Sequence, residues 1–300
     1  MDAWIPITIA AAAAQTVRFM LQKHLKSTAL TTTGATFARF VYSAPLVGVL
    51  ILIYAKASVQ PLPAMSGVFW ACAMAGGLSQ ILATMCVVAL FAERNFAVGI
   101  TFKKTEVIQT AIVGYLVLGE GLSRAGVLAV LLGFVGVVIL SDPPGGIGRL
   151  WQRVANRAAG LGLLSGVFFA VSAVGYRGAS LSLGSGDTAL RAGFTLAVVT
   201  ASQTAAMLIW LAWRDRAQIV AVARAWRIAA LVGLASMVGS FCWFTAFTLQ
   251  NAAYVNTLGQ VELLFSLAAS VLFFKEKISG RELLGIAVLL ASIVLLVVLI

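Results

Sequence analysis

The sequence has very few charged residues. Only 10% of its 300 residues are Asp, Glu, Lys or Arg, and it contains a single histidine. Soluble domains carry about 25% charged residues, so this chain lacks the composition of a water-exposed surface. Hydrophobic residues make up 61% of the chain and come in unbroken runs. The sequence therefore predicts an all-α integral membrane protein, and the absence of alternation excludes a transmembrane β-barrel.

Residues that support catalysis or metal binding are also scarce. Cys72, Cys86 and Cys242 lie in apolar stretches without the spacing of a metal site or a disulfide. His24 is at a predicted membrane edge, and the chain has no Gly-rich phosphate-binding loop. We therefore expect no enzyme activity, no cofactor and no ATP-driven pumping. Coupling to a proton or another ion remains open.

The formal net charge of +11 has two interpretations, nucleic-acid binding and anchoring to lipid headgroups. The arginines outside the apolar runs sit in short connections, where they anchor a protein to anionic lipid headgroups. The predicted partners are therefore membrane lipids and a small-molecule substrate, and not nucleic acid. The oligomeric state, monomer or homodimer, stays open.

Apolar runs and helix breakers together predict ten membrane-spanning helices. Connections between most of them are short, so consecutive helices are expected to be antiparallel neighbours. The predicted spans are 3–22, 31–54, 66–90, 96–118, 122–141, 158–176, 188–211, 228–249, 255–274 and 280–300.

The chain also contains an internal repeat. Shifting the sequence by 156 positions, the separation of Glu106 and Glu262, superposes polar residues that chance pairing of apolar sequence would not align. These pairs include Cys86 with Cys242, Asn95 with Asn251, Thr101 with Thr257, and Glu120 with Glu276. The chain is therefore a tandem repeat whose units each carry a carboxylate into the membrane.

The repeat divides the chain into two halves of five helices. Residues 1–141 form the first half, 142–157 a polar connection that contains Pro143 and Pro144, and 158–300 the second half. Because five is odd, the second half must enter the membrane from the opposite side. This predicts two inverted-topology repeats around a central cavity, an arrangement typical of transporters.

Loop lysines and arginines fall mainly on one side of this predicted topology. That side includes Lys26, Arg157 and Arg216, whereas only three, Lys56, Arg124 and Arg177, fall on the other. The positive-inside rule then places both termini outside the cytoplasm.

Two related signatures resemble a known family. Val117–Leu122 precedes a Gly-rich apolar helix, and Phe273–Ile278 precedes the last helix; Ala38–Phe40 and Leu190–Ala192 add to the pattern. Together they resemble the drug/metabolite transporter superfamily, in its EamA branch. The resemblance covers nearly the whole chain. It implies two EamA-like five-helix repeats, a cavity open to one side at a time, and secondary transport of a small metabolite. It implies no particular substrate.

Charged side chains gather in the middle of spans 96–118 and 255–274. Lys103 and Glu106 are three residues apart and share a helix face. A charge at the bilayer centre costs at least about 2.5–3.5 kcal/mol on insertion scales, so these groups need a protein interior or a wet cavity. We predict a substrate cavity lined by Lys103, Lys104, Glu106, Gln109, Trp243, Asn256, Gln260 and Glu262. The alternative is that the Lys–Glu pairs only tie helices together.

Within this set, we expect the two lysines to bind a charged group of the substrate. Glu106 and Glu262 are expected to gate transport, either by exchanging a proton or by opening and closing ion pairs. The amides are expected to orient the substrate through hydrogen bonds. Trp243 is either a wall of the cavity or, as the pattern favours, a packing residue. Other charges have plainer explanations at helix ends. Arg18, Arg39 and Arg191 are expected to reach lipid headgroups or to pair within the protein, and the alternative is that they bind an anion in a vestibule of the cavity. Glu120 and Glu276 are expected to face water.

The function predicted from these features is alternating-access transport of a small polar metabolite, either anionic or zwitterionic, such as an amino acid or organic acid. The predicted location is the bacterial inner (plasma) membrane, which the chain crosses many times. The alternatives are a lipid flippase and a non-transporting membrane scaffold. An intramembrane enzyme is disfavoured, because no reactive set of side chains occurs at membrane depth.

Overall fold

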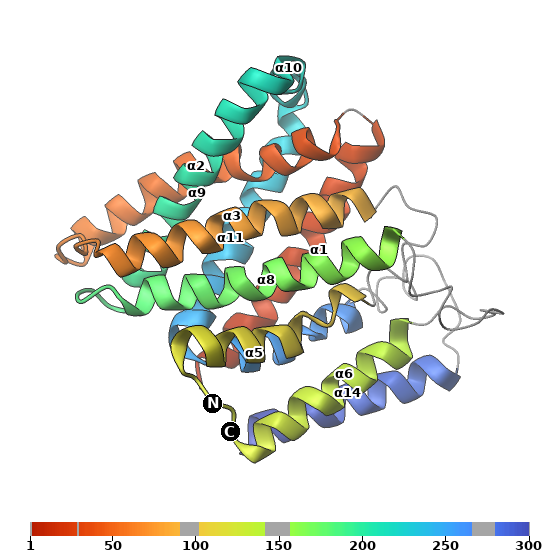
Figure 1. Cartoon of the computed structure of the whole chain (residues 1–300). Coiled ribbons are helices and arrows are strands. Elements are labelled where there is room, and N and C mark those ends of the chain that lie inside the picture. The colour runs from red at the N-terminus through yellow and green to blue at the C-terminus, as the bar shows by residue number, and fades with distance from the viewer. Residues whose placement is uncertain (1, 29, 91–101, 142–156, 266–279, 300) are drawn as a thin grey trace.

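The computed structural model describes residues 2–28, 30–90, 102–141, 157–265 and 280–299 (Figure 1). These residues form helices and connections, and no strand occurs among them. The helices are α1 (Trp4–Thr28), α2 (Thr32–Ala57), α3 (Gly67–Leu90), α5 (Glu106–Leu118), α6 (Arg124–Ser141), α8 (Arg157–Leu181), α9 (Thr188–Arg214), α10 (Arg216–Arg224), α11 (Trp226–Leu249), α12 (Ala252–Gly259) and α14 (Gly280–Leu299).

Within the described residues, six helices are long and apolar enough to cross a membrane: α1, α2, α3, α8, α9 and α11. Glu106–Leu118, Arg124–Ile139 and Leu283–Leu299 are apolar but shorter. Each of these nine helices overlaps one of the ten predicted spans, and α1, α2, α8, α9 and α11 extend beyond theirs. For predicted span 255–274, residues 266–274 lie outside the described part, as do residues 96–101 of span 96–118. The short α10 was not predicted.

Large apolar side chains cover the exterior of the molecule, and several charged side chains are buried inside it, as expected of a protein in lipid. Leu50, Ile53, Leu116 and Ile209 are among many large apolar side chains on the exterior. Arg18, Arg39, Lys103, Lys104, Glu106 and Gln260 are instead among the buried residues. Because hydrocarbon does not solvate polar groups, these side chains are held where other protein groups can satisfy them.

Helix ends meet at two opposite faces of the bundle. At the first, which we call the termini face, Gln60 after α2 donates to Asp187 before α9. At the other face, Thr31 before α2 donates to Gln218 in α10. Trp4 packs in the same cluster as Leu296 of α14, so both chain ends lie at the termini face (Figure 1).

Glycines allow several helices to cross closely. A Cβ on Gly175 of α8 would lie 2.8 Å from the carbonyl oxygen of Cys72 in α3. A Cβ on Gly136 of α6 would lie 2.8 Å from the backbone nitrogen of Leu289 in α14. Small residues at such crossings let backbones approach, which supplies the van der Waals contact that holds membrane helices together. Helices α6 and α14 lie side by side at one edge of the molecule (Figure 1).

The two central helical segments are both interrupted, at nearly equivalent places in the repeat. Residues 102 and 103 are helical, Lys104 and Thr105 form a turn, and α5 begins at Glu106. In the second half α12 ends at Gly259, Gln260 is a turn, and residues 261–265 are helical again. At both turns a backbone N–H donates to the carbonyl oxygen three residues earlier, with an N···O distance of 3.2 Å. Tightening of this kind inside a helix often marks a functional site.

Candidate functional site

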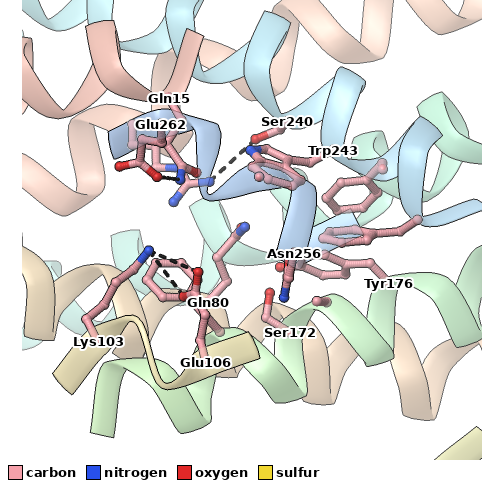
Figure 2. A pocket seen from close by; sticks show the side chains of 16 residues that line it. Gln15, Gln80, Lys103, Glu106, Ser172, Tyr176, Ser240, Trp243, Asn256 and Glu262 are labelled. Atoms are coloured by element: carbon pink, nitrogen blue, oxygen red, sulfur yellow. Dashed lines mark hydrogen bonds and ion pairs between the residues drawn. The ribbon is translucent and has the colours of Figure 1, made fainter. Parts of the chain in front are cut away.

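A cavity lies at the centre of the bundle, beside the two interrupted segments. Its volume is about 50 Å³, which is room for a few water molecules. Side chains from both halves of the chain line it, contributed by α1, α2, α3, α5, α8, α11 and α12 (Figure 2). Of the eight predicted site residues, Lys103, Glu106, Trp243, Asn256 and Glu262 line the cavity, whereas Lys104, Gln109 and Gln260 do not.

Two buried ion pairs neutralise the lysines and glutamates. Lys103 Nζ lies 3.1 Å from Glu106 Oε2 within the first half. Lys104 Nζ lies 3.4 Å from Glu262 Oε2 and so joins the first half to the second. Figure 2 shows Lys103 and Glu106 on the side of the cavity opposite Gln15 and Glu262. Both carboxylates begin a helical segment, where the amide dipoles favour negative charge.

Helix α1 adds a polar relay to Glu262. Gln15 Nε2 donates to Glu262 Oε2 at 3.0 Å. Arg18 in turn donates to Gln15 Oε1 at 3.4 Å and to Gln22 Oε1 at 2.8 Å. Arg18 is 2% exposed, so of the two outcomes favoured from the sequence, headgroup contact and pairing within the protein, the structure shows the second. The side chain points into the bundle because glutamines of its own helix offer oxygens there.

Arg39 in α2 is likewise paired within the protein and does not reach headgroups. Its guanidinium donates to Thr84 Oγ1 of α3 at 2.8 Å and to Ser240 Oγ of α11 at 3.4 Å. The residue is 4% exposed and lines the cavity. Position near a helix start suggested a headgroup contact, but hydroxyls on two neighbouring helices draw the side chain inward. Arg191, half-buried, is not among the cavity residues.

The predicted amides bond mainly to their own surroundings. Asn256 Nδ2 donates to Thr110 Oγ1 at 2.9 Å, which links α12 to α5. Gln260 Nε2 donates to the carbonyl of Asn256 at 3.2 Å, and Gln109 Nε2 donates to Thr105 Oγ1 at 3.0 Å. The Oε1 atoms of both glutamines are buried without a hydrogen-bond partner among the described residues. Asn256 is therefore the amide placed to meet a molecule in the cavity.

Aromatic side chains form the remaining wall. Trp243 and Phe247 stack with ring centroids 5.6 Å apart, and Tyr176 and Phe244 stack at 4.1 Å. Trp243 therefore packs against Phe247 and also lines the cavity, so both interpretations of this residue from the sequence apply. Lys103 Nζ lies 5.1 Å from the ring centroid of Phe169, close enough for a cation–π contact.

Glu120 forms a clamp at the termini face. Arg177 Nε lies 2.7 Å from its Oε1, and Arg177 Nη1 donates to the carbonyls of Phe247 and Gln250 at 2.6 and 2.7 Å. Glu120, predicted to face water, is therefore held by an arginine of the other half. Glu276 lies outside the described residues.

Several lining residues did not stand out in the sequence. They are Gln15, Arg39, Gln80, Ser172, Tyr176 and Ser240. Most are neutral polar residues in long apolar helices, and only their position on the inward side of each helix would have marked them. Among the described residues, no group of three His, Cys, Asp or Glu side chains could hold a metal ion.

Comparison with known proteins bears on the family and the fold. Residues 156–298 match the model of the EamA-like transporter family. One solved crystal structure superposes with a TM-score of 0.69 at 15% identity, and covers 100% of this chain and 98% of its own. At that identity the likeness concerns the fold alone. No curated protein matches the sequence.

Proposed function

Residues 156–298 match the EamA-like transporter family, and on this premise we propose that the chain carries a small anionic or zwitterionic metabolite by alternating access. The match confirms the resemblance read from the sequence, and with it a multi-pass membrane transporter of the drug/metabolite kind. The substrate class, the mechanism and the bacterial inner membrane as location are our proposals. The observation that carries them is the central cavity, where two carboxylates and two cations line a space inside an apolar shell.

Inverted-topology repeats would supply the two states of such a carrier. The packing supports this proposal, because the following contacts between a helix of the first half and one of the second have counterparts between the equivalent helices of the repeat. α3 of the first half packs on α8, the first helix of the second half, and α11 packs on α1 in the corresponding way. Likewise α5 contacts α8 and α12 contacts α1. α1 leaves the termini face whereas α8 ends there, so the first helices of the halves run in opposite directions.

The size of the cavity fits a closed state of this cycle. Small-molecule sites have volumes of about 300–1,000 Å³, well above the 50 Å³ found here. A metabolite therefore enters only when helices move apart. The ion pair between Lys104 and Glu262 joins the halves, and we infer that the substrate competes for one of these charges as the halves separate.

Transport by purified protein in liposomes tests the proposal. Amino acids and organic acids would be offered under imposed proton and sodium gradients. We expect saturable uptake of at least one compound, and Glu106→Gln should abolish it in protein that still folds. Asp215→Asn, at the connection between α9 and α10, neutralises an acid outside the cavity and is the matched control. No uptake of any compound would overturn the proposal.

A second candidate, a lipid flippase, is favoured by one observation. An apolar pocket of about 340 Å³ lies between α2, α9 and α11, lined by residues that include Leu50, Gly193 and Phe241. Its shape and chemistry suit an acyl chain. Fluorescent phospholipid translocation in the same liposomes, without metabolite uptake, would support this function instead.

A further inference from the structure

Arg39 lies deep in the bundle and is directed at the cavity. It is the eighth residue of α2, so it lies about 10 Å along the axis from the start of that helix. Its guanidinium reaches across to α3 and α11, through the contacts with Thr84 and Ser240. A side chain held by two neighbouring helices is not free to reach a headgroup.

The charge of Arg39 has no counter-ion in the part of the chain that the structure describes. Its two hydrogen-bond partners are neutral hydroxyls, and the ion pairs found there join other residues. Lys103, by contrast, already has Glu106. Arg18 lies near enough to Arg39 for the two like charges to repel, and this repulsion adds to the cost of burying Arg39. Among the described lining residues, Arg39 is thus the cation without a carboxylate.

We propose that Arg39, together with the hydroxyl of Ser240, binds the carboxylate group of the transported molecule. This inference rests on the proposed function and deepens it, because it assigns the anion to Arg39 and not to the lysines. A buried cation is costly unless an anion meets it, so an arriving carboxylate gains more at Arg39 than at a lysine already paired. The guanidinium edge suits a planar carboxylate, which it can contact through two donors.

The surroundings of Arg39 fit a carboxylate with an apolar body. Arg39 Nη1 donates to the hydroxyl of Thr84, and Arg39 Nη2 lies 3.4 Å from the hydroxyl of Ser240. Ser240 also lines the cavity. Trp243, Phe244 and Phe247 come from the same helix as Ser240 and line the same space. The lysine–glutamate pairs can then stay intact or open during the cycle without being the primary anion site.

Equilibrium binding of a small anion tests the inference on the full-length protein in detergent. Acetate is small enough for the present cavity, and acetamide is its neutral counterpart. Thermal unfolding would be followed with rising sodium acetate at constant ionic strength, balanced with sodium chloride. We expect acetate to raise the unfolding temperature of the wild type, since a ligand that binds the native state stabilises it. Acetamide should not raise it.

Variants locate the effect. Arg39→Gln keeps a donor for Thr84 and should weaken acetate binding about tenfold or more, the scale of a lost charge-assisted contact. Arg191→Gln removes an arginine that does not line the cavity and should respond as the wild type does. Should Arg39→Gln fail to fold, Ser240→Ala takes its place, and it should show a reduced acetate effect. An equal acetate effect in the wild type and the cavity variant, or none in the wild type, overturns the inference.

Phosphate is the second arm, because it carries similar charge in tetrahedral form. Stabilisation by phosphate alone would overturn the assignment of a carboxylate. The binding and transport assays together distinguish failure of the anion site from failure of the proposed function. Acetate binding that needs Arg39, without uptake of any compound, would remove the proposed function and leave the anion site. Uptake that continues at wild-type affinity in Arg39→Gln would remove the anion site and leave the function.

Discussion

Glu262 has partners from distant parts of the chain. Gln15 of α1 donates to it, and Lys104, before α5, forms an ion pair with it. One carboxylate thereby connects three segments at the centre of the bundle. Its side chain is 13% exposed and that of Lys104 is 3% exposed, so water screens this pair little.

The first prediction concerns this pair. Glu262→Gln removes the carboxylate and leaves the buried ammonium of Lys104 without it, which should destabilise the protein by about 3 kcal/mol. Adding Lys104→Met removes the orphaned charge and should restore most of that loss. Unfolding in detergent, followed for the wild type, both single variants and the double variant, measures the coupling. A double variant no more stable than Glu262→Gln would contradict the ion pair.

At this scale, the sequence located charged residues better than it oriented them. Lys103, Glu106 and Glu262 stood out because charges in long apolar runs are rare, and all three line the cavity. The sequence did not decide whether Arg39 reaches headgroups, pairs within the protein or binds an anion, because its direction depends on Thr84 and Ser240, hydroxyls from helices distant in the chain. Pairings such as Lys104 with Glu262 likewise depend on how the halves pack.

Asp187 shows how a single loop residue fixes a helix end. Its Oδ1 accepts from the amide of Leu190 at 2.8 Å and so caps α9, while Tyr54 and Gln60 donate to Oδ2. The hydrogen bond from the Leu190 amide, followed by that from Gln60, lowers the pKa of the carboxyl below its usual value. The ionised form is therefore the one that the folded protein favours.

The second prediction follows from this cap. Asp187→Ala should destabilise the protein by about 1 kcal/mol at neutral pH. Because the pKa is lower in the folded state, the contribution of Asp187 is present above the unfolded pKa, about 3.9. It is lost as the pH falls through the folded pKa, so the variant and the wild type should converge below about pH 4. Unfolding temperatures measured from pH 7 to pH 3 check this.

Asp215 is the control for that experiment. It lies between α9 and α10, and its side chain makes no capping hydrogen bond. Asp215→Ala should therefore change stability little at any of these pH values. A cost as large as that of Asp187→Ala would mean that loss of negative charge, and not of the cap, is responsible.

The third prediction concerns the crossing of α3 and α8. Gly175→Ala places a methyl group 2.8 Å from a backbone oxygen and 3.0 Å from Gly76 Cα, so the helices must separate. We expect a loss of about 1–3 kcal/mol, the usual cost of overpacking. Gly160→Ala in the same helix meets nothing within 4 Å and should be neutral or slightly stabilising. Equal stability of the two variants would contradict the close crossing.

Elements were predictable where composition is uniform and less so where a helix is interrupted. α3 and α11 begin and end within two residues of spans 66–90 and 228–249. The breaks at Lys104 and Gln260 were not predicted: no Pro or Gly stands at the first, and a single residue, Gly259, precedes the second. At the first break Lys104 pairs with Glu262 of the other half, and such a tertiary contact cannot be read from the local sequence.

At the scale of the molecule, two clamps of different strength join the halves. Arg177 and Glu120 meet at the termini face in close, part-buried contact, at 2.7 Å. The pair of Lys104 with Glu262, at mid-depth, is longer at 3.4 Å. In the proposed cycle the central pair would open to admit substrate, while the clamp at the termini face must break only when that face opens. In that proposed cycle, the present structure would correspond to a state closed at the termini face.

The last prediction concerns how the molecule sits in the membrane. The termini face carries Gln60 and Asp187, and the opposite face carries α10 with Arg214, Arg216 and Arg224 at or near its ends. Basic loops stay in the cytoplasm, so the termini face should lie outside.

Single cysteines would be placed at Gln60 and Gln218 after replacement of Cys72, Cys86 and Cys242, and labelled in intact cells with a membrane-impermeant maleimide. Gln60→Cys should react directly, and Gln218→Cys only after permeabilisation. The reverse pattern would place both termini in the cytoplasm, and reaction of both positions would mean that Gln60 and Gln218 do not lie on opposite sides of one membrane.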